Sequence, residues 1–169
     1  MQTNEIERIL REDPISDFFF EGVFPKDLLP NPLTMGKLYV INLDTSVQPG
    51  SHWCLLSTLH SPTFTEYFDS FGVAPPDEII PIMLKAGETI FFSDLQLQSI
   101  ISAVCGQFVI VVAMMLSRGW KLLEIISHFS FLPAVPLIND AYVKSVISAF
   151  MDESDRPLPF LHPDFMKKN

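Results

Sequence analysis

Three separated segments of the chain carry side chains that are typical of covalent catalysis at a carbonyl group. In chain order they are Gly50-Ser51-His52-Trp53, Tyr67-Phe68-Asp69-Ser70-Phe71-Gly72, and Gln98 ahead of Cys105-Gly106. A cysteine thiolate is a strong nucleophile, an imidazole can take up and return its proton, and a carboxylate can fix the tautomer of that imidazole. We therefore predict Cys105 as nucleophile, His52 as general base and Asp69 as the residue that orients the histidine.

Acyl transfer also needs hydrogen-bond donors aimed at the oxyanion, and the loss of one donor typically costs about two to three powers of ten in rate. The side-chain amide of Gln98 and the backbone N–H of Cys105 are the candidate donors, and Gln96 is the rival to Gln98. Gly106 lets the chain pass close to a bound substrate with little steric cost.

Two predicted strands position the histidine and the carboxylate. Trp53–Leu59 and Phe64–Phe68 have strand-like character, and a turn-forming Ser-Pro pair lies between them. In an antiparallel hairpin, His52 at the start of one strand comes next to Asp69 at the end of the other. Glu66 is the alternative carboxylate, but its odd spacing from Asp69 points it to the opposite face.

The remaining pattern predicts an α+β domain in which a mixed or antiparallel sheet packs on a buried helix. That helix is expected to begin at Cys105 and to run to about Arg118, where its N-terminal dipole lowers the pKa of the cysteine. It is apolar nearly all round, and the apolar stretch from Ile100 to Leu116 is marginally short for a membrane span. The other predicted segments are a helix capped by Asn4 and ended by Asp13-Pro14, an aromatic loop Phe18–Pro32, strands Leu38–Leu43 and Thr89–Phe92, helices from Pro75 to Gly87, Lys121–Phe129 and Asn139–Met151, and a tail with Phe160 and Phe165.

Composition bounds the class of protein. With 169 residues, 48% hydrophobic and 18% charged, the chain is expected to form one domain over residues 1–169. The net charge of −9 argues against a general affinity for nucleic acid, which rests on basic side chains. No export signal is visible, and two cysteines fit a reducing compartment better than a disulfide scaffold.

Other candidate residues are expected to be structural. Cys54 is interpreted as a core thiol, although it can face the same side as His52. His60, His128 and His162 have no partners at metal-like spacing, so we expect no metal site and interpret them as surface or tail histidines.

The order His-Trp, Asp-Ser-Phe-Gly and Gln before Cys-Gly resembles the adenovirus-type maturation cysteine proteases (adenain-like), and more distantly the proteases that remove SUMO-like modifiers. The resemblance covers most of the chain, and its spacing favours Gln98 over Gln96. It implies an adenain-like fold and an endopeptidase that cleaves viral precursor proteins at glycine-containing sites during virion maturation. The alternatives are a protease that removes ubiquitin-like or SUMO-like modifiers and an inactive module that keeps the fold.

The resemblance also implies further roles. Trp53 would shield the histidine and, with Gly106, bind substrate in a groove that selects glycine by its narrowness. The source would be an adenovirus-like virus, virophage, polinton or adintovirus, and the location the virion and the interior of the host cell, in the nucleus or a cytoplasmic virus factory. The best-known member of the family that this chain resembles uses DNA and a disulfide-linked peptide as activators. This acidic chain is expected to work as a monomer and without a DNA cofactor. Cys54, the spare cysteine, is placed in the core, so a disulfide-linked activating peptide is not expected. A peptide activator of this chain would bind non-covalently.

Overall fold

The structure is a computed structural model that describes residues 1–130 and 136–152. In these ranges five strands form one mixed sheet in the order β1-β2-β3-β4-β5. The strands are β1 (Phe20–Pro25), β2 (Leu38–Asn42), β3 (Trp53–Ser57), β4 (Phe64–Phe68) and β5 (Thr89–Phe92). β2, β3 and β4 are antiparallel neighbours, whereas β1 pairs parallel to β2 and β5 parallel to β4. The predicted α+β class is confirmed.

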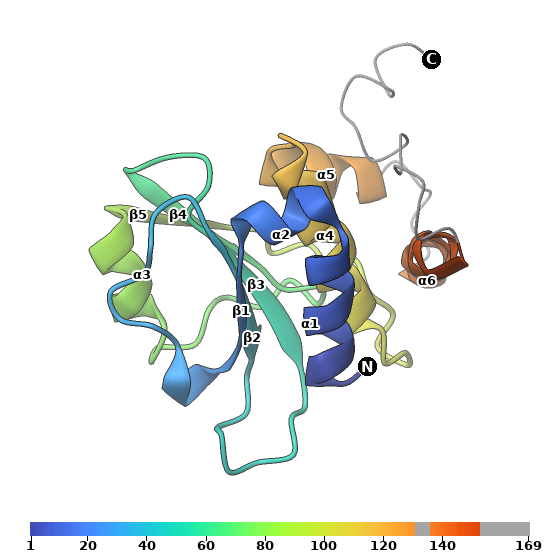
Figure 1. The fold of residues 1–169 in the computed structure, drawn as a ribbon, viewed down its shortest axis with the longest axis horizontal. Coiled ribbons are helices and arrows are strands. Elements are labelled where there is room, and N and C mark those ends of the chain that lie inside the picture. The colour runs from blue at the N-terminus through green and yellow to red at the C-terminus, as the bar shows by residue number, and fades with distance from the viewer. Residues whose placement is uncertain (131–135, 153–169) are drawn as a thin grey trace.

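Helices cover both faces of the sheet (Figure 1). They are α1 (Thr3–Glu12), α2 (Pro14–Phe19), the 3-10 turn η1 (Lys26–Leu28), α3 (Ile80–Ala86), α4 (Cys105–Ser117), α5 (Leu122–Ser130) and α6 (Pro136–Asp152). One face packs on α1 and α4 through residues such as Leu55 and Phe68, and α5 and α6 pack on the far side of α4 in the same core. The other face packs on α3 through residues such as Leu56 and Tyr67. Side chains alternate between the two faces along a strand, so the same strands contribute residues to the hydrophobic cores on both sides of the sheet.

Helix α4 is the central helix of the larger core. From Phe108 to Leu116 every residue is at most 2% exposed, so other parts of the protein surround this stretch on all sides. This burial explains why the helix carries apolar side chains all round. It packs directly against β3. As predicted, it begins at Cys105, and this packing fixes the position of that residue relative to the start of β3.

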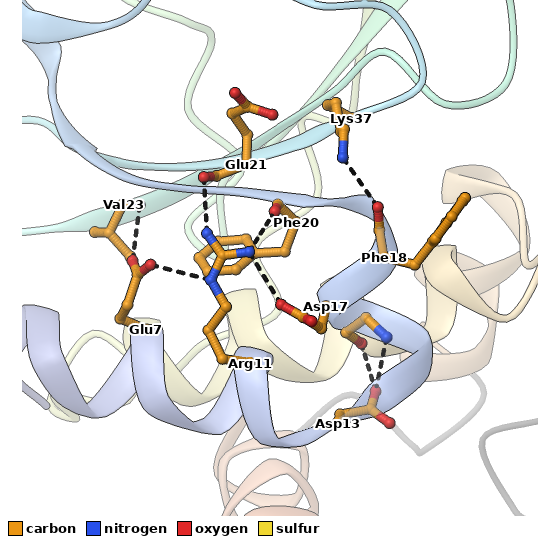
Figure 2. A network of polar contacts seen from close by, with 10 residues as sticks. Glu7, Arg11, Asp13, Asp17, Phe18, Phe20, Glu21, Val23 and Lys37 are labelled. Atoms are coloured by element: carbon orange, nitrogen blue, oxygen red, sulfur yellow. Dashed lines mark hydrogen bonds and ion pairs between the residues drawn. The ribbon is translucent and has the colours of Figure 1, made fainter.

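Helix α1 is fastened to the outer edge of the sheet by two long side chains (Figure 2). The guanidinium of Arg11 donates to the carbonyls of Phe20 at 2.9 Å and Glu21 at 3.0 Å, and it lies over the Phe20 ring at 4.7 Å. A carboxylate oxygen of Glu7 accepts the backbone N–H of Val23 at 3.2 Å. These contacts satisfy the free backbone groups of an edge strand and so protect it from pairing with other chains.

The structure corrects three predicted segments. The stretch Phe18–Pro32 is not a loop, because it contains the end of α2, all of β1 and η1. Its glycine and prolines resembled loop signals, but parallel pairing with β2 holds residues 20–25 extended. The first helix begins at Thr3 and not after Asn4, since Glu5 accepts the N–H of Gln2 at 2.6 Å.

The third correction concerns the start of α3. It begins at Ile80, a turn later than the predicted Pro75 start, and it ends at Gly87 as predicted. The buried helix after Cys105 is confirmed, and no helix in residues 1–130 or 136–152 is long and apolar enough to cross a membrane. The predicted tail with Phe160 and Phe165 lies outside the described residues.

Candidate active site

The β3–β4 hairpin brings His52 and Asp69 together. Leu55 faces Phe68 in the antiparallel register, so the next pair beyond the ladder places Cys54 opposite Asp69. The His52 ring reaches across from the start of β3, and its Nε2 lies 2.9 Å from Oδ2 of Asp69. The two side chains are 15% and 1% exposed, so this contact is largely shielded from water.

The residues that follow Asp69 fix the carboxylate and the imidazole. The backbone N–H of Phe71 donates to Oδ1 of Asp69 at 2.7 Å. The Phe71 ring stacks on the imidazole of His52 with centroids 5.0 Å apart and planes 30° apart. Gly72 has φ of 73°, and a Cβ there would lie 2.6 Å from the carbonyl oxygen of Asp94, so only glycine fits this turn.

Cys105 is the first residue of α4, and His52 lies near enough to affect the pKa of its thiol. Burial disfavours its thiolate, but the interaction with His52 and hydrogen bonding from the backbone of Trp53 and Gly106 lower the pKa of the Cys105 thiol below its ordinary value. Burial likewise works against a charged His52, yet hydrogen bonding to Asp69, Cys105 and Cys54 raises its pKa to about 12. The opposite shifts favour a thiolate beside an imidazolium.

Gln98 is held in one orientation by two serines. The hydroxyl of Ser70 donates to Oε1 of Gln98 at 2.7 Å, and Nε2 of Gln98 donates to the carbonyl of Ser102 at 2.9 Å. Gln98 as a whole is 1% exposed. The backbone N–H of Gln98 also donates to the carbonyl of Ser70 at 2.9 Å, so the residue next to Asp69 anchors the glutamine twice.

The segment that carries Gln98 is braced from α6. Asn139 donates to the carbonyl of Leu97 at 3.0 Å, and Oδ1 of Asp140 accepts the N–H of Ser99 at 3.3 Å. Gln96, the rival oxyanion donor, is used in another way, because its Nε2 donates to the carbonyl of Gln98 at 2.9 Å. Gln96 therefore supports the segment.

The predicted substrate-binding residues both contact Met1. Nε1 of Trp53 donates to the carbonyl of Met1 at 3.4 Å, and Trp53 is 8% exposed. A Cβ on Gly106 would lie 2.9 Å from the Cβ of Met1. A cavity of about 200 Å³ adjoins Trp53 and is lined by the end of β1, the start of α1 and the loop that leads from β2 to His52.

Glu66 does not join this cluster. Its Oε2 accepts the hydroxyl of Ser57 at 3.0 Å and pairs with Nδ1 of His60 at 2.8 Å, on the other face of β4. It borders a larger cavity of about 700 Å³ beside the start of α5. The spacing argument against Glu66 therefore agrees with its position.

Sequence reasoning did not assign functional roles to Ser70, Phe71 and Cys54. Cys54 is fully buried, as expected of a core thiol, but its Sγ lies 3.2 Å from Oδ2 of Asp69. The available signal was strand alternation, which places it on the side of His52. The nitrogen, sulfur and oxygen of His52, Cys54 and Asp69 lie within 4.8 Å of one another, a donor set that zinc accepts. Burial raises the pKa of Cys54 to about 12, which disfavours the thiolate that zinc requires.

Comparison with known proteins supports the fold. No protein-family model and no curated protein sequence matches the chain. A crystal structure of the ASFV pS273R protease aligns with 85% of this chain and 66% of its own, with a TM-score of 0.57 and 15% identity. This chain therefore spans slightly less than two thirds of that protease. The chain shares its α+β fold with that protease, which agrees with the predicted fold but does not single out the adenovirus proteases.

Proposed function

We propose that the chain is a cysteine endopeptidase with Cys105 as nucleophile, His52 as general acid and base, and Asp69 as the residue that orients the histidine. The observation that carries the proposal is the His52–Asp69 contact of 2.9 Å beside a cysteine at the start of a buried helix. A lone buried cysteine would remain an uncharged thiol, whereas the pKa of Cys105 is lowered. The fold shared with the ASFV pS273R protease supports peptide-bond hydrolysis as the reaction.

In the proposed reaction, the thiolate sulfur of Cys105 attacks the carbonyl carbon of the scissile bond. The imidazolium of His52 gives its proton to the leaving amine, and a thioester remains. Neutral His52 then takes a proton from water, whose oxygen attacks the thioester and releases the acid and the thiol. Asp69 accepts from Nε2, which leaves Nδ1 for proton exchange with the sulfur and the amine.

The oxyanion would be bound by two donors. Cys105 begins α4, so its backbone N–H is one of the orphan donors of the helix. One hydrogen on Nε2 of Gln98 donates to Ser102, and the other would serve the oxyanion. Ser70 prevents the amide from flipping, because its hydroxyl donates to Oε1.

We infer viral precursor proteins with glycine near the scissile bond as the substrate class. The support is the shared fold of a viral protease together with the His-Trp, Asp-Ser-Phe-Gly and Gln, Cys-Gly motifs. Trp53 and Gly106 would form the narrow groove once the contact with Met1 is displaced. The net charge of −9 favours activity without DNA, so an activator of this enzyme would be a peptide.

The test is cleavage of a Gly-Gly-containing peptide under reducing conditions by wild-type protein and by Cys105→Ala. We expect cleavage by the wild type and none by the variant. Iodoacetamide should label Cys105 and not the fully buried Cys54. Retention of cleavage in Cys105→Ala would refute the assignment. Electrophilic probes ending in the C-terminus of ubiquitin or SUMO form a second arm, and faster reaction of Cys105 with them than with the peptide would change the substrate class to modifiers.

A further inference from the structure

Cys54 shares the carboxylate oxygen that orients the histidine. Oδ2 of Asp69 lies 2.9 Å from Nε2 of His52 and 3.2 Å from Sγ of Cys54. Oδ1 accepts the backbone N–H of Phe71. The carboxylate therefore has a donor on each side, and Cys54 is fully buried.

The proton on this sulfur has a defined direction. Burial raises the pKa of Cys54 to about 12, so the group is a thiol at neutral pH. A thiol has one hydrogen to donate, and Sγ of Cys54 donates to Oδ2 of Asp69 at 3.2 Å, so the S–H points at Asp69. The titratable groups that face Cys54 are Asp69, His52 and Tyr67, and burial raises the pKa of the Tyr67 phenol, which stays neutral as well.

We propose that Cys54 is a positioning residue whose S–H···Oδ2 bond holds Asp69 against His52. The inference rests on the proposed function of Cys105 and extends it to the other cysteine. Without the thiol, Oδ2 would be anchored by His52 only, and the carboxylate could turn away from the ring. The imidazolium would then be less stabilised, and the Cys105 thiolate beside it would be less stable in turn.

The test compares Cys54→Ala with Cys54→Ser, two variants that differ by one oxygen atom and therefore hardly in volume. The readout is the second-order rate of Cys105 alkylation by iodoacetamide as a function of pH, which needs no substrate. We expect Cys54→Ala to raise the midpoint of the profile by about one pH unit and to slow alkylation at pH 6 about tenfold, as befits one hydrogen bond to a charged group. Cys54→Ser should stay within about threefold of the wild type because the hydroxyl donates to Asp69.

Three outcomes would overturn the proposal. An unshifted midpoint in Cys54→Ala would mean that the thiol has no effect on the pair. Equal upward shifts in both variants would mean that the sulfur acts through packing. A lower midpoint in Cys54→Ala would mean that the thiol competes with His52 for Oδ2. If Cys54→Ala does not fold, Cys54→Ser decides by itself, since a midpoint about one unit higher than that of the wild type contradicts a donor role.

The same experiment separates this proposal from the proposed function. A wild-type protein that cleaves no peptide but shows a Cys54-dependent alkylation profile would remove the protease assignment and keep the positioning role. Peptide cleavage together with an alkylation profile that is the same in the wild type and the Cys54 variants would keep the protease assignment and remove the positioning role.

Discussion

At the residue scale, each of the four residues of the segment Asp69-Ser70-Phe71-Gly72 makes a different contact or turn at the site. Asp69 accepts from His52, Ser70 fixes Gln98, Phe71 stacks on the imidazole, and Gly72 allows the turn. The proposed base and the proposed oxyanion donor are thereby positioned by one short stretch of backbone. A shift at the end of β4 would displace both groups together.

Replacement of Ser70 by alanine should lower kcat by about tenfold to a hundredfold, because the amide of Gln98 loses the bond that fixes its orientation. KM should change little, since the amide acts mainly on the transition state. Steady-state kinetics on the cleaved peptide measure both constants.

The matched control is Ser117→Ala at the other end of α4. Its hydroxyl is also buried and donates to the carbonyl of Ala113 at 2.8 Å, far along the helix from Cys105. Equal losses of kcat in both variants would show that Ser70 acts through stability and not through Gln98.

At the element scale, a buried ion pair joins the α1–α2 junction to the end of α4. The two terminal nitrogens of Arg118 lie 2.8 and 2.9 Å from the two carboxylate oxygens of Asp13. The side chains are 5% and 4% exposed. Burial opposes ionisation of Asp13, but Arg118 and Ser16 lower the pKa of its carboxyl below 3.8. The helix that carries Cys105 is therefore fixed at its far end by a charge pair.

The sign of this shift predicts acid sensitivity. A carboxyl with a lowered pKa contributes stability above its unfolded value of 3.8, and this contribution is lost as pH falls through the lower folded value. Asp13→Asn should lose about 3 kcal/mol of unfolding free energy at pH 7. The difference from the wild type should shrink steadily below about pH 4. Urea unfolding at several pH values measures it.

A double-mutant cycle with Arg118→Met provides the control. Each single variant leaves one buried charged or polar group without its partner, so the double variant should recover part of the loss. A difference between the wild type and Asp13→Asn that stays constant from pH 7 to pH 2 would contradict the ionic account.

The sequence predicted those elements whose signals are local. Alternation and turn residues indicated β3 and β4, and the continuous apolar run indicated α4, so the His52–Asp69 contact followed from a hairpin. β1 was missed because its extended form depends on pairing with β2 and on Arg11 and Glu7 from α1. The sequence of residues 20–25 alone does not predict contacts with those distant partners.

The same limit applies to the site. Residue type and motif order were enough to nominate His52, Asp69 and Cys105. The contact of Cys54 with Asp69 depends on strand register, and the bracing of the Gln98 segment by Asn139 depends on how α6 packs. Roles that arise from packing were therefore beyond the reach of spacing arguments.

At the scale of the whole molecule, surface charge is the property that would act on substrates before they bind. The chain has 20 acidic and 11 basic residues. Several basic side chains are already paired with carboxylates within the fold, among them Arg8, Arg11, Lys26 and Arg118. The uncompensated charge is therefore acidic, and its field attracts cationic segments.

This field predicts a dependence of cleavage on salt and on substrate charge. Between about 0.02 and 0.5 M NaCl, kcat/KM for a glycine-site peptide flanked by lysines should fall about threefold to tenfold, because salt screens the attraction. A peptide of the same length with serines in place of the lysines should change less than about twofold, and one with glutamates should be cleaved faster as salt rises. Parallel salt profiles for the three peptides would show that the charge of −9 does not reach the site, and that substrates are selected by the groove only.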